Sequence, residues 1–438
     1  MARMTAAATT LTPAAPPSEL VRLQHRTLGA LVAVQVVGGP GVAVGVTVCA
    51  LLAQRMGGTA VSGLSQSALV VGSALLAVPV ARLMTRFGRP AGLAAAYLVG
   101  ALGAGLVLVG AARHDLALLL AGLFCFGGGS TAGLQARYAA VDLSSPERRG
   151  RHLSLVVWAT AVGSIAGPNL VPLAAGPLSR LGFDAYAAPF LFSGVAFLIA
   201  ATVGFLALRP DPLLTARALS VGTVAPAAQR SAGLRAAARE IAASPGARLG
   251  VAATTVGHAV MIAVMSLTPV HISEFTSGST QLSGDAGHGD TLRLVGLVIS
   301  AHIAGMYVLS PVTGWLTDRF GRRRVIVGGV GLLVVACAVA GTAGHGTAGL
   351  TVGLSLLGMG WSATMVAGST LVSESVGVAN RASVQGLSDL VMGLAGALAG
   401  ALAGLIVAWS SYAVLTAVAA VATVPLLAAA LRPSGRSA

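Results

Sequence analysis

Gly314-Trp-Leu-Thr-Asp-Arg-Phe-Gly-Arg-Arg-Arg324 is a basic segment that follows an apolar run in the second half of the chain. A related segment, Ala81-Arg-Leu-Met-Thr-Arg-Phe-Gly-Arg89, follows an apolar run in the first half. In the longer segment, Gly321 allows a tight turn, and Asp318 can accept hydrogen bonds from free N–H groups at a neighbouring helix start. The arginines favour an anionic membrane surface. The shared Arg-Phe-Gly-Arg therefore predicts one loop repeated in two related halves of a membrane protein.

The composition is also that of a membrane protein. Of the 438 residues, 55% are hydrophobic and only 9% are charged, and the mean hydropathy is +0.85. Soluble domains carry about 25% charged residues. The length leaves room for roughly a dozen helices of about 20 residues each. The lipid bilayer is therefore the expected partner of most of the surface.

Twelve apolar runs give the expected helices. We predict an all-α integral membrane protein with an N-terminal six-helix bundle over residues 28–208 and a C-terminal six-helix bundle over residues 248–431. Residues 209–247 form a cytoplasmic linker with a short amphipathic helix at 231–243, and residues 1–27 and 432–438 are cytoplasmic tails. The runs lie at 28–53, 60–82, 90–112, 116–139, 152–175, 185–208, 248–272, 292–313, 325–344, 347–371, 383–408 and 411–431.

The arginines give an orientation. All 27 basic residues are arginines, and with the N-terminus in the cytoplasm only Arg55, Arg113, Arg180 and Arg293 fall on the outer side, which leaves 23 inside. This asymmetry supports both the helix number and the orientation. We therefore predict a multi-pass protein of the plasma (inner) membrane with both termini in the cytoplasm. The net charge of +14 follows from this bias, so no nucleic acid is expected as a partner.

The segment 314–324 resembles the signature loop of the major facilitator superfamily. The first copy departs from that loop, because Thr85 replaces the acid and Ala81 replaces the glycine. The resemblance implies two parallel six-helix bundles around a central cavity, which work by alternating access. In that family the acid and its arginines hold the inward side closed, so the resemblance implies a gate made by Asp318, Arg319 and Arg322.

The fifth run contains Gly163-Ser-Ile-Ala-Gly167-Pro168-Asn169, which resembles the Gly-x-x-x-Gly-Pro stretch of facilitator antiporters. Small residues four apart also let two helices pack closely, and Pro168 introduces a bend. A functional role and a packing role both remain open for this stretch. Asn169 and Gln35 in turn either line the cavity or bridge helices.

Soft metal donors occur at one-turn spacing on two consecutive runs. The seventh run holds Met261 and Met265, with His258 one turn earlier, and the eighth run holds His302 and Met306. Residues at i and i+4 share a helix face, and thioether sulfur with imidazole suits Cu(I). The helical rise places Met261 about 16 Å and His302 about 15 Å below the outer surface, near the midplane. Methionine as an ordinary core residue is the alternative.

The pairing of Met-x-x-x-Met with His-x-x-x-Met resembles the CcoA-like copper importers of the superfamily. That resemblance implies that Met261, Met265, His302 and Met306 bind transported Cu(I). Related branches transport other small molecules, including riboflavin, so the resemblance leaves the substrate open.

Asp389 is a carboxylate within the eleventh run, and it shares a helix face with Arg381 and Gln385. An intramembrane carboxylate is a candidate for proton coupling. The alternative is a static ion pair, with Arg137 or with an arginine of the 319–324 loop.

Together these features predict a secondary transporter, and Cu(I) import is the sharpest version. The alternatives are proton-coupled export of a small organic compound or drug by an antiporter, transport of another small molecule such as riboflavin, and a non-transporting membrane sensor or scaffold. The sequence contains no Walker loop and no catalytic constellation, so we expect neither an enzyme nor a bound cofactor. We expect a monomer.

Overall fold

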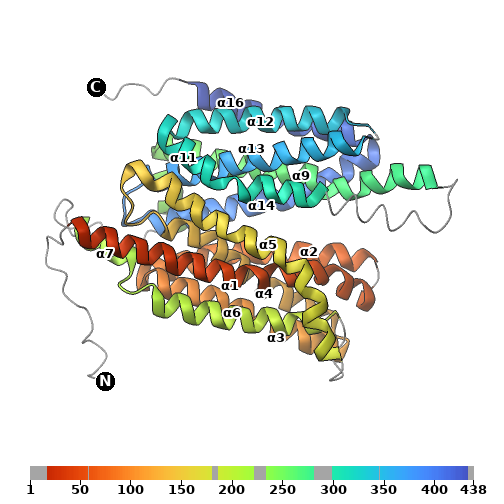
Figure 1. Cartoon of the computed structure of the whole chain (residues 1–438), viewed down its shortest axis with the longest axis horizontal. Helices are drawn as coiled ribbons and strands as arrows, with labels where there is room; N and C mark the ends of the chain where they lie inside the picture. The colour runs from red at the N-terminus through yellow and green to blue at the C-terminus, as the bar shows by residue number, and fades with distance from the viewer. Residues whose placement is uncertain are drawn as a thin grey trace.

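The computed structural model describes residues 17–57, 59–179, 186–220, 233–280, 298–344 and 346–432. In these ranges the chain is helical apart from short connections, and it contains no strand. Helices suit such an apolar chain, because a helix satisfies its own backbone N–H and C=O groups where no water is present. The two halves of the chain form two bundles that lie side by side (Figure 1).

The first bundle packs around aromatic rings. The Phe126 ring lies 5.3 Å from the Phe190 ring and 5.1 Å from the Phe197 ring, measured between centroids. These rings join the fourth helix of the bundle to the sixth. The helices are α1 (Pro17–Gly57), α2 (Thr59–Phe87), α3 (Arg89–Arg113), α4 (Leu116–Ala139), α5 (Arg149–Ser179) and α6 (Ala188–Ala207), and a short 3-10 turn, η1 (Pro146–Arg148), precedes α5.

The second bundle contains one irregular span. Residues 298–320 begin as an α-helix, pass through a π-helical turn, η3 (Ala304–Val308), and continue as α11 (Ser310–Phe320). A π-turn inside a helix is rare and often marks a functional site. The other helices are α9 (Pro245–Thr280), α12 (Arg322–Thr342), α13 (Thr347–Glu374), α14 (Arg381–Trp409), α15 (Tyr412–Ala422) and α16 (Val424–Leu431).

Ten of the twelve predicted spans are confirmed in the described ranges. Ten of the described segments are long and apolar enough to cross a membrane. The other two predicted spans, the fifth and the eighth, correspond to α5 and to residues 298–320. The fold is therefore an all-α membrane fold, and the described ranges contain six long helical segments in each half.

Several helices begin or end away from the bounds of the predicted runs. α1 already begins at Pro17, so residues 17–27 of the predicted tail are helical; a proline in the first turn and the early Glu19 favour a helix start there. α9 begins at Pro245 and extends to Thr280, past the predicted end at 272. The linker contains the predicted amphipathic helix as α8 (Leu234–Ala243) and, in addition, the unpredicted α7 (Pro212–Ser220).

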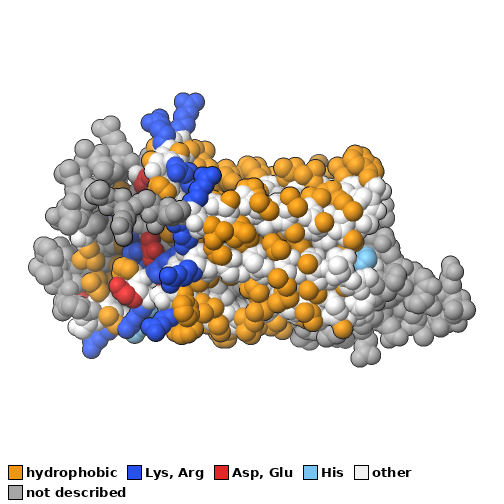
Figure 2. Space-filling model, turned by 90° about the horizontal axis from the view of Figure 1, so that it is seen from above, with side chains coloured by type: hydrophobic (Ala, Val, Ile, Leu, Met, Phe, Trp, Pro, Cys, Tyr) orange, Lys and Arg blue, Asp and Glu red, His pale blue; other side chains and the backbone are white. Residues whose placement is uncertain are grey.

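Arginine side chains gather in a band at one end of a hydrophobic side surface (Figure 2). We call this the arginine-rich end; the last turns of α2 and α11, with Arg86 and Arg319, lie there. The surface beyond the band exposes large apolar side chains such as Leu98, Leu198 and Val335. Such a surface is suited to lipid, with the arginines at the level of the headgroups.

Candidate functional site

The two bundles meet at the arginine-rich end through small residues and polar side chains. α5 packs against α11, and α2 packs against α14. At the first contact, a Cβ added to Gly150 would lie 2.7 Å from the carbonyl oxygen of Gly314. At the second, a Cβ added to Gly386 would lie 2.3 Å from the Cβ of Ala81. Glycine therefore allows the backbones of the two bundles to approach closely enough for short hydrogen bonds.

Asp318 joins the second bundle to the first. Its carboxylate accepts hydrogen bonds from the Gly150 N–H at 2.8 Å and the Arg151 N–H at 2.9 Å, at the start of α5. These N–H groups have no partner inside their own helix, and a helix start favours an anion. The side chain is only 2% exposed, and its charge is compensated by the two N–H groups and by Arg322. The geometry fits the predicted gate, whose role stays a prediction.

Arg322 and Glu374 extend the contact between Asp318 and the start of α5. We call these residues together the joint. Arg322 Nη2 lies 2.6 Å from Glu374 Oε1 and 3.6 Å from Asp318 Oδ1, and it also donates to the Pro146 carbonyl of the first bundle. Arg149 of α5 lies 3.5 Å from the same Glu374 oxygen. Arg319, by contrast, is exposed on the last turn of α11. Of the two arginines predicted for the gate, the structure brings only Arg322 to the joint.

The corresponding loop of the first bundle holds a buried charge network. Arg89 is fully buried, and its guanidinium lies 2.7 Å from Asp142 Oδ2 and 2.7 Å from Gln385 Oε1 of α14. Arg381, also of α14, lies 3.4 Å from Asp142 Oδ1. This network therefore crosses between the bundles. Sequence reasoning missed Arg89 and Asp142 as partners, although each is a charged residue at the end of an apolar run.

Asp389 of α14 is paired with α4 of the other bundle. Its carboxylate lies 2.5 Å from Arg137 Nη2 and accepts from Gln135 Nε2 at 2.8 Å. Arg137 also donates through Nε to the Ser369 hydroxyl of α13 at 3.2 Å. All four side chains are buried. Of the two roles considered for Asp389, the ion pair with Arg137 is present in the structure.

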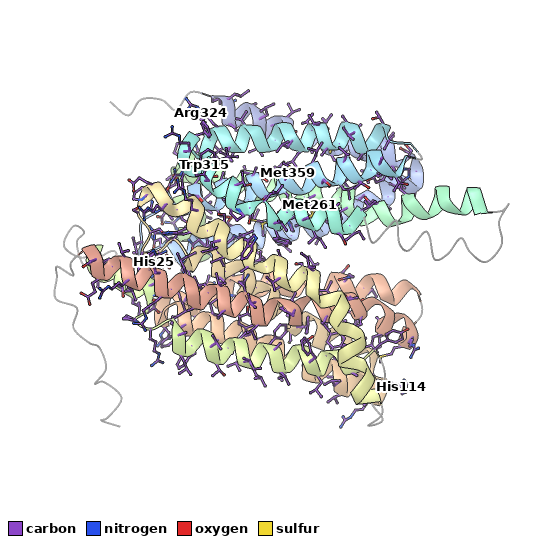
Figure 3. All side chains as sticks on the ribbon, in the orientation of Figure 1. His25, His114, Met261, Trp315, Arg324 and Met359 are labelled. Carbon is purple, nitrogen blue, oxygen red and sulfur yellow. The ribbon has the colours of Figure 1, made fainter. Side chains whose placement is uncertain are left out.

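The predicted metal donors lie within the second bundle. His302 is fully buried, and its Nδ1 donates to the Leu354 carbonyl at 2.8 Å, which leaves Nε2 without a hydrogen-bond partner. Met261 and Met306 are buried in one apolar cluster, and Met265 packs at its edge. Met261 lies along the bundle between the end marked by Arg324 and the end marked by His114 (Figure 3). A single metal site shared by these donors stays a prediction.

Near these residues lies an aromatic group that sequence reasoning did not identify. Trp361 of α13 donates through Nε1 to His258 Nδ1 of α9 at 3.2 Å, and the Tyr307 ring of η3 lies edge-on to the Trp361 ring at 5.6 Å. His258 and Tyr307 remain partly exposed, although both lie inside spans. Tyr307 also packs against an apolar cluster that contains Leu153 and Val157 of α5 in the first bundle. The group therefore lies at the interface between the two bundles.

The small-residue stretch of α5 serves packing at Gly163. A Cβ added to Gly163 would lie 2.4 Å from the backbone of Gly39, so α1 and α5 cross in close contact. Gln35 bridges helices: it donates to Thr160 Oγ1 at 2.9 Å and accepts from Tyr97 at 3.4 Å. The surroundings of Gly167, Pro168 and Asn169 lie outside what the structure describes.

Two six-span bundles that meet through polar groups at one end define the class of membrane transporters with two pseudo-equivalent halves. The model of the Major Facilitator Superfamily matches residues 34–287 and 284–437. The chain belongs to this superfamily, and it is an MFS transporter.

The chain is also similar to individual transporters over most of its length. The chain is 37% identical to the uncharacterized MFS-type transporter YdeG of Bacillus subtilis, over 96% of this chain and 94% of YdeG. It is 28% identical to the riboflavin transporter RfnT of Brucella anthropi, over 84% of this chain and 85% of RfnT. A bacterial homologue of the iron transporter ferroportin, solved in the outward-facing state, superposes with a TM-score of 0.67 at 14% identity, over 92% of this chain and 98% of that chain. The last comparison concerns the fold alone.

Asp389→Asn should destabilise the protein, because it leaves the Arg137 guanidinium buried without its counter-charge. Removing one partner of a buried ion pair typically costs about 3–5 kcal/mol. We expect a clearly lower thermal unfolding temperature in detergent, followed by tryptophan fluorescence. The double variant Arg137→Gln/Asp389→Asn removes both charges and should recover much of the loss. Equal losses in the single and double variants would show that the pair does not stabilise this region.

Proposed function

We propose that this transporter moves a small molecule by alternating access of its two bundles. The observation that carries the proposal is the joint at Asp318. Hydrogen bonds and ion pairs hold the bundles together there, and such contacts can be exchanged for contacts with water when the bundles rock apart. The arginine distribution further supports an arginine-rich end that faces the cytoplasm, in a plasma membrane.

For the cargo we propose a planar heteroaromatic compound, with riboflavin as the first compound to test. Trp361, Tyr307 and His258 bring three rings together from three helices, and aromatic faces favour stacking with other rings. Because Trp361 donates to His258 Nδ1, a neutral His258 carries its proton on Nε2, which can donate to a polar ring edge. The similarity to RfnT also supports this cargo.

Trp361→Ala should lower riboflavin uptake into proteoliposomes by about fivefold or more, because the stacking face and the His258 contact are both lost. Flavin fluorescence inside washed vesicles measures the uptake. Trp409→Ala is the matched control, because Trp409 is 84% exposed on α14, and it should leave uptake unchanged. Unchanged uptake with Trp361→Ala would remove this residue from the cargo site. Absence of uptake by the unaltered protein, for riboflavin and for related planar compounds, would refute the cargo class.

Cu(I) is the second candidate cargo, and His302 is the observation that favours it. A metal-binding histidine usually donates its other ring N–H to a carbonyl or carboxylate, as His302 does to Leu354. The free Nε2 and the sulfur atoms of Met306, Met261 and Met265 are donors that Cu(I) prefers. In this hypothesis the copper ion is the substrate, and it binds to these donors while it crosses the membrane.

Met306→Leu should abolish copper accumulation in cells that produce the protein, because leucine fills a similar volume without a sulfur donor. Cellular copper is measured by mass spectrometry against cells without the protein. Met392→Leu is the control: Met392 is buried in the same cluster but is not among the proposed ligands. If both variants accumulate copper as well as the unaltered protein, or if the unaltered protein accumulates none, the copper hypothesis is wrong.

The alternative function, proton-coupled export, would use Asp389 as its proton carrier. The short contact of Asp389 with Arg137 and the hydrogen bond from Gln135 favour a carboxylate that stays ionised. This arrangement supports a structural role for Asp389 between the bundles rather than a role in proton transfer.

A further inference from the structure

The first-half loop lacks the acid that the second-half loop uses. Asp318 reaches across to cap α5, whereas the side chain at the corresponding position, Thr85, donates to the Ala81 carbonyl of its own helix at 2.8 Å. Across the interface, Thr85 Oγ1 lies 3.3 Å from Ser383 Oγ of α14. A neutral hydroxyl contact of this kind is weaker than a carboxylate on two N–H groups. The Arg89–Asp142 network also crosses on this side, but the last turn of α2 itself would be held more firmly by a further charged contact.

Arg217 of the linker helix α7 supplies such a contact. Its Nη1 donates to the Thr85 carbonyl at 2.6 Å, and its Nη2 donates to the Ala379 carbonyl at 2.9 Å. Thr85 lies in the last turn of α2, where carbonyl groups lack partners within the helix and a cation is favourable. Ala379 lies in the connection 375–380 between α13 and α14. One guanidinium thus joins the end of α2 in the first bundle to the second bundle.

α7 is held firmly enough to position Arg217. Leu213 and Ala216 are buried, and Leu213 belongs to the same apolar cluster as Ala382 of α14. Asp211 accepts from the N–H groups of Leu213 and Leu214 at 2.8 and 3.0 Å, which caps the start of α7. Asp211 also lies directly over Gly88 of the first-half loop, where an added Cβ would be 1.6 Å from its Oδ2. α7 therefore sits on the first-half loop itself.

The other described linker helix, α8, also contacts the connection 375–380. Glu240 of α8 accepts from the Gly377 N–H at 3.3 Å, and α8 packs against α9 and α14. The connection 375–380 is thus held by Arg217 from the side of the first bundle and by Glu240 from the second. A movement of the bundles that opened the arginine-rich end would have to separate Arg217 from Ala379 or from Thr85.

We propose that α7 is a strap that replaces the missing acid of the first-half loop, and that Arg217 holds the arginine-rich end closed until the bundles rock apart. This inference rests on the proposed alternating access, but it is independent of the cargo. The strap is a gating element supplied by the linker, outside the two repeated loops.

The distance between the bundles at the arginine-rich end tests the strap. Spin labels at Arg86→Cys and Arg319→Cys, both exposed at that end, report on the two bundles once the three native cysteines are replaced by alanine. Double electron–electron resonance in nanodiscs then measures the fraction of molecules with a long distance. Arg217→Gln should raise that fraction about five- to tenfold, because two charge-assisted hydrogen bonds across the interface are lost.

Three further variants make the result specific. Arg209→Gln removes a linker arginine whose Nε donates to the Phe205 carbonyl of α6 in its own bundle, and it should leave the distances unchanged. Thr85→Asp restores the acid, and combined with Arg217→Gln it should return the fraction toward the original value. Arg217→Lys keeps the charge without the two-pronged geometry and should give an intermediate fraction; it also serves if Arg217→Gln does not fold.

Asp318→Asn separates the strap from the proposed function. If Asp318→Asn raises the long-distance fraction and neither Arg217 variant does, the strap is refuted and alternating access at the joint stands. If Asp318→Asn also leaves the distances unchanged, the gate of the proposed function fails as well. An increase with Arg217→Gln that equals the effect of Arg209→Gln would also overturn the strap, since loss of charge alone would then explain it.

Discussion

The structure depends on the pairing of buried charges between its two bundles. An ionised group away from water is costly unless a counter-charge or several hydrogen-bond donors surround it. In this transporter Asp389 meets Arg137, Asp142 meets Arg89 and Arg381, and Asp318 meets the N–H groups of α5. Each set includes contributions from both halves of the chain. The charges therefore specify how the bundles face one another, in a way that apolar side chains could not.

The same constraint suits movement. Close backbone contacts at Gly150 and Gly386 bring the helices together at the arginine-rich end without large side chains between them. The apolar clusters, by contrast, lie mostly within each bundle, for example around Phe126 in the first and Leu354 in the second. Rigid bundles joined by exchangeable polar contacts are the arrangement that alternating access requires. Tyr307 of the aromatic group packs at this interface, against Leu153 and Val157 of α5.

Much of the fold could be predicted, because length and hydropathy constrain a chain in lipid strongly. Ten of the twelve runs correspond to described segments able to span a membrane, the other two are helical, and the amphipathic part of the linker is α8. The start of α1 at Pro17 and the helix α7 were missed, since both lie in polar segments where local packing, rather than hydropathy, stabilises the helix. The site was harder to predict: Asp389 was recognised, with Arg137 as one possible partner, but Asp142 and Trp361 are unremarkable in sequence and acquire their roles through neighbours far along the chain.

The amino-acid sequence alone determined the membrane class, the two related halves and the repeated loop, because apolar length and arginine position act locally along the chain. It also marked Asp318 as an acid able to cap a helix. Only the tertiary structure decided which helix start that acid caps, that His302 turns one nitrogen to Leu354, and that Arg217 reaches both Thr85 and Ala379. These are contacts between distant segments, whose geometry depends on how whole helices cross, and no local pattern encodes the rotation of one helix against another.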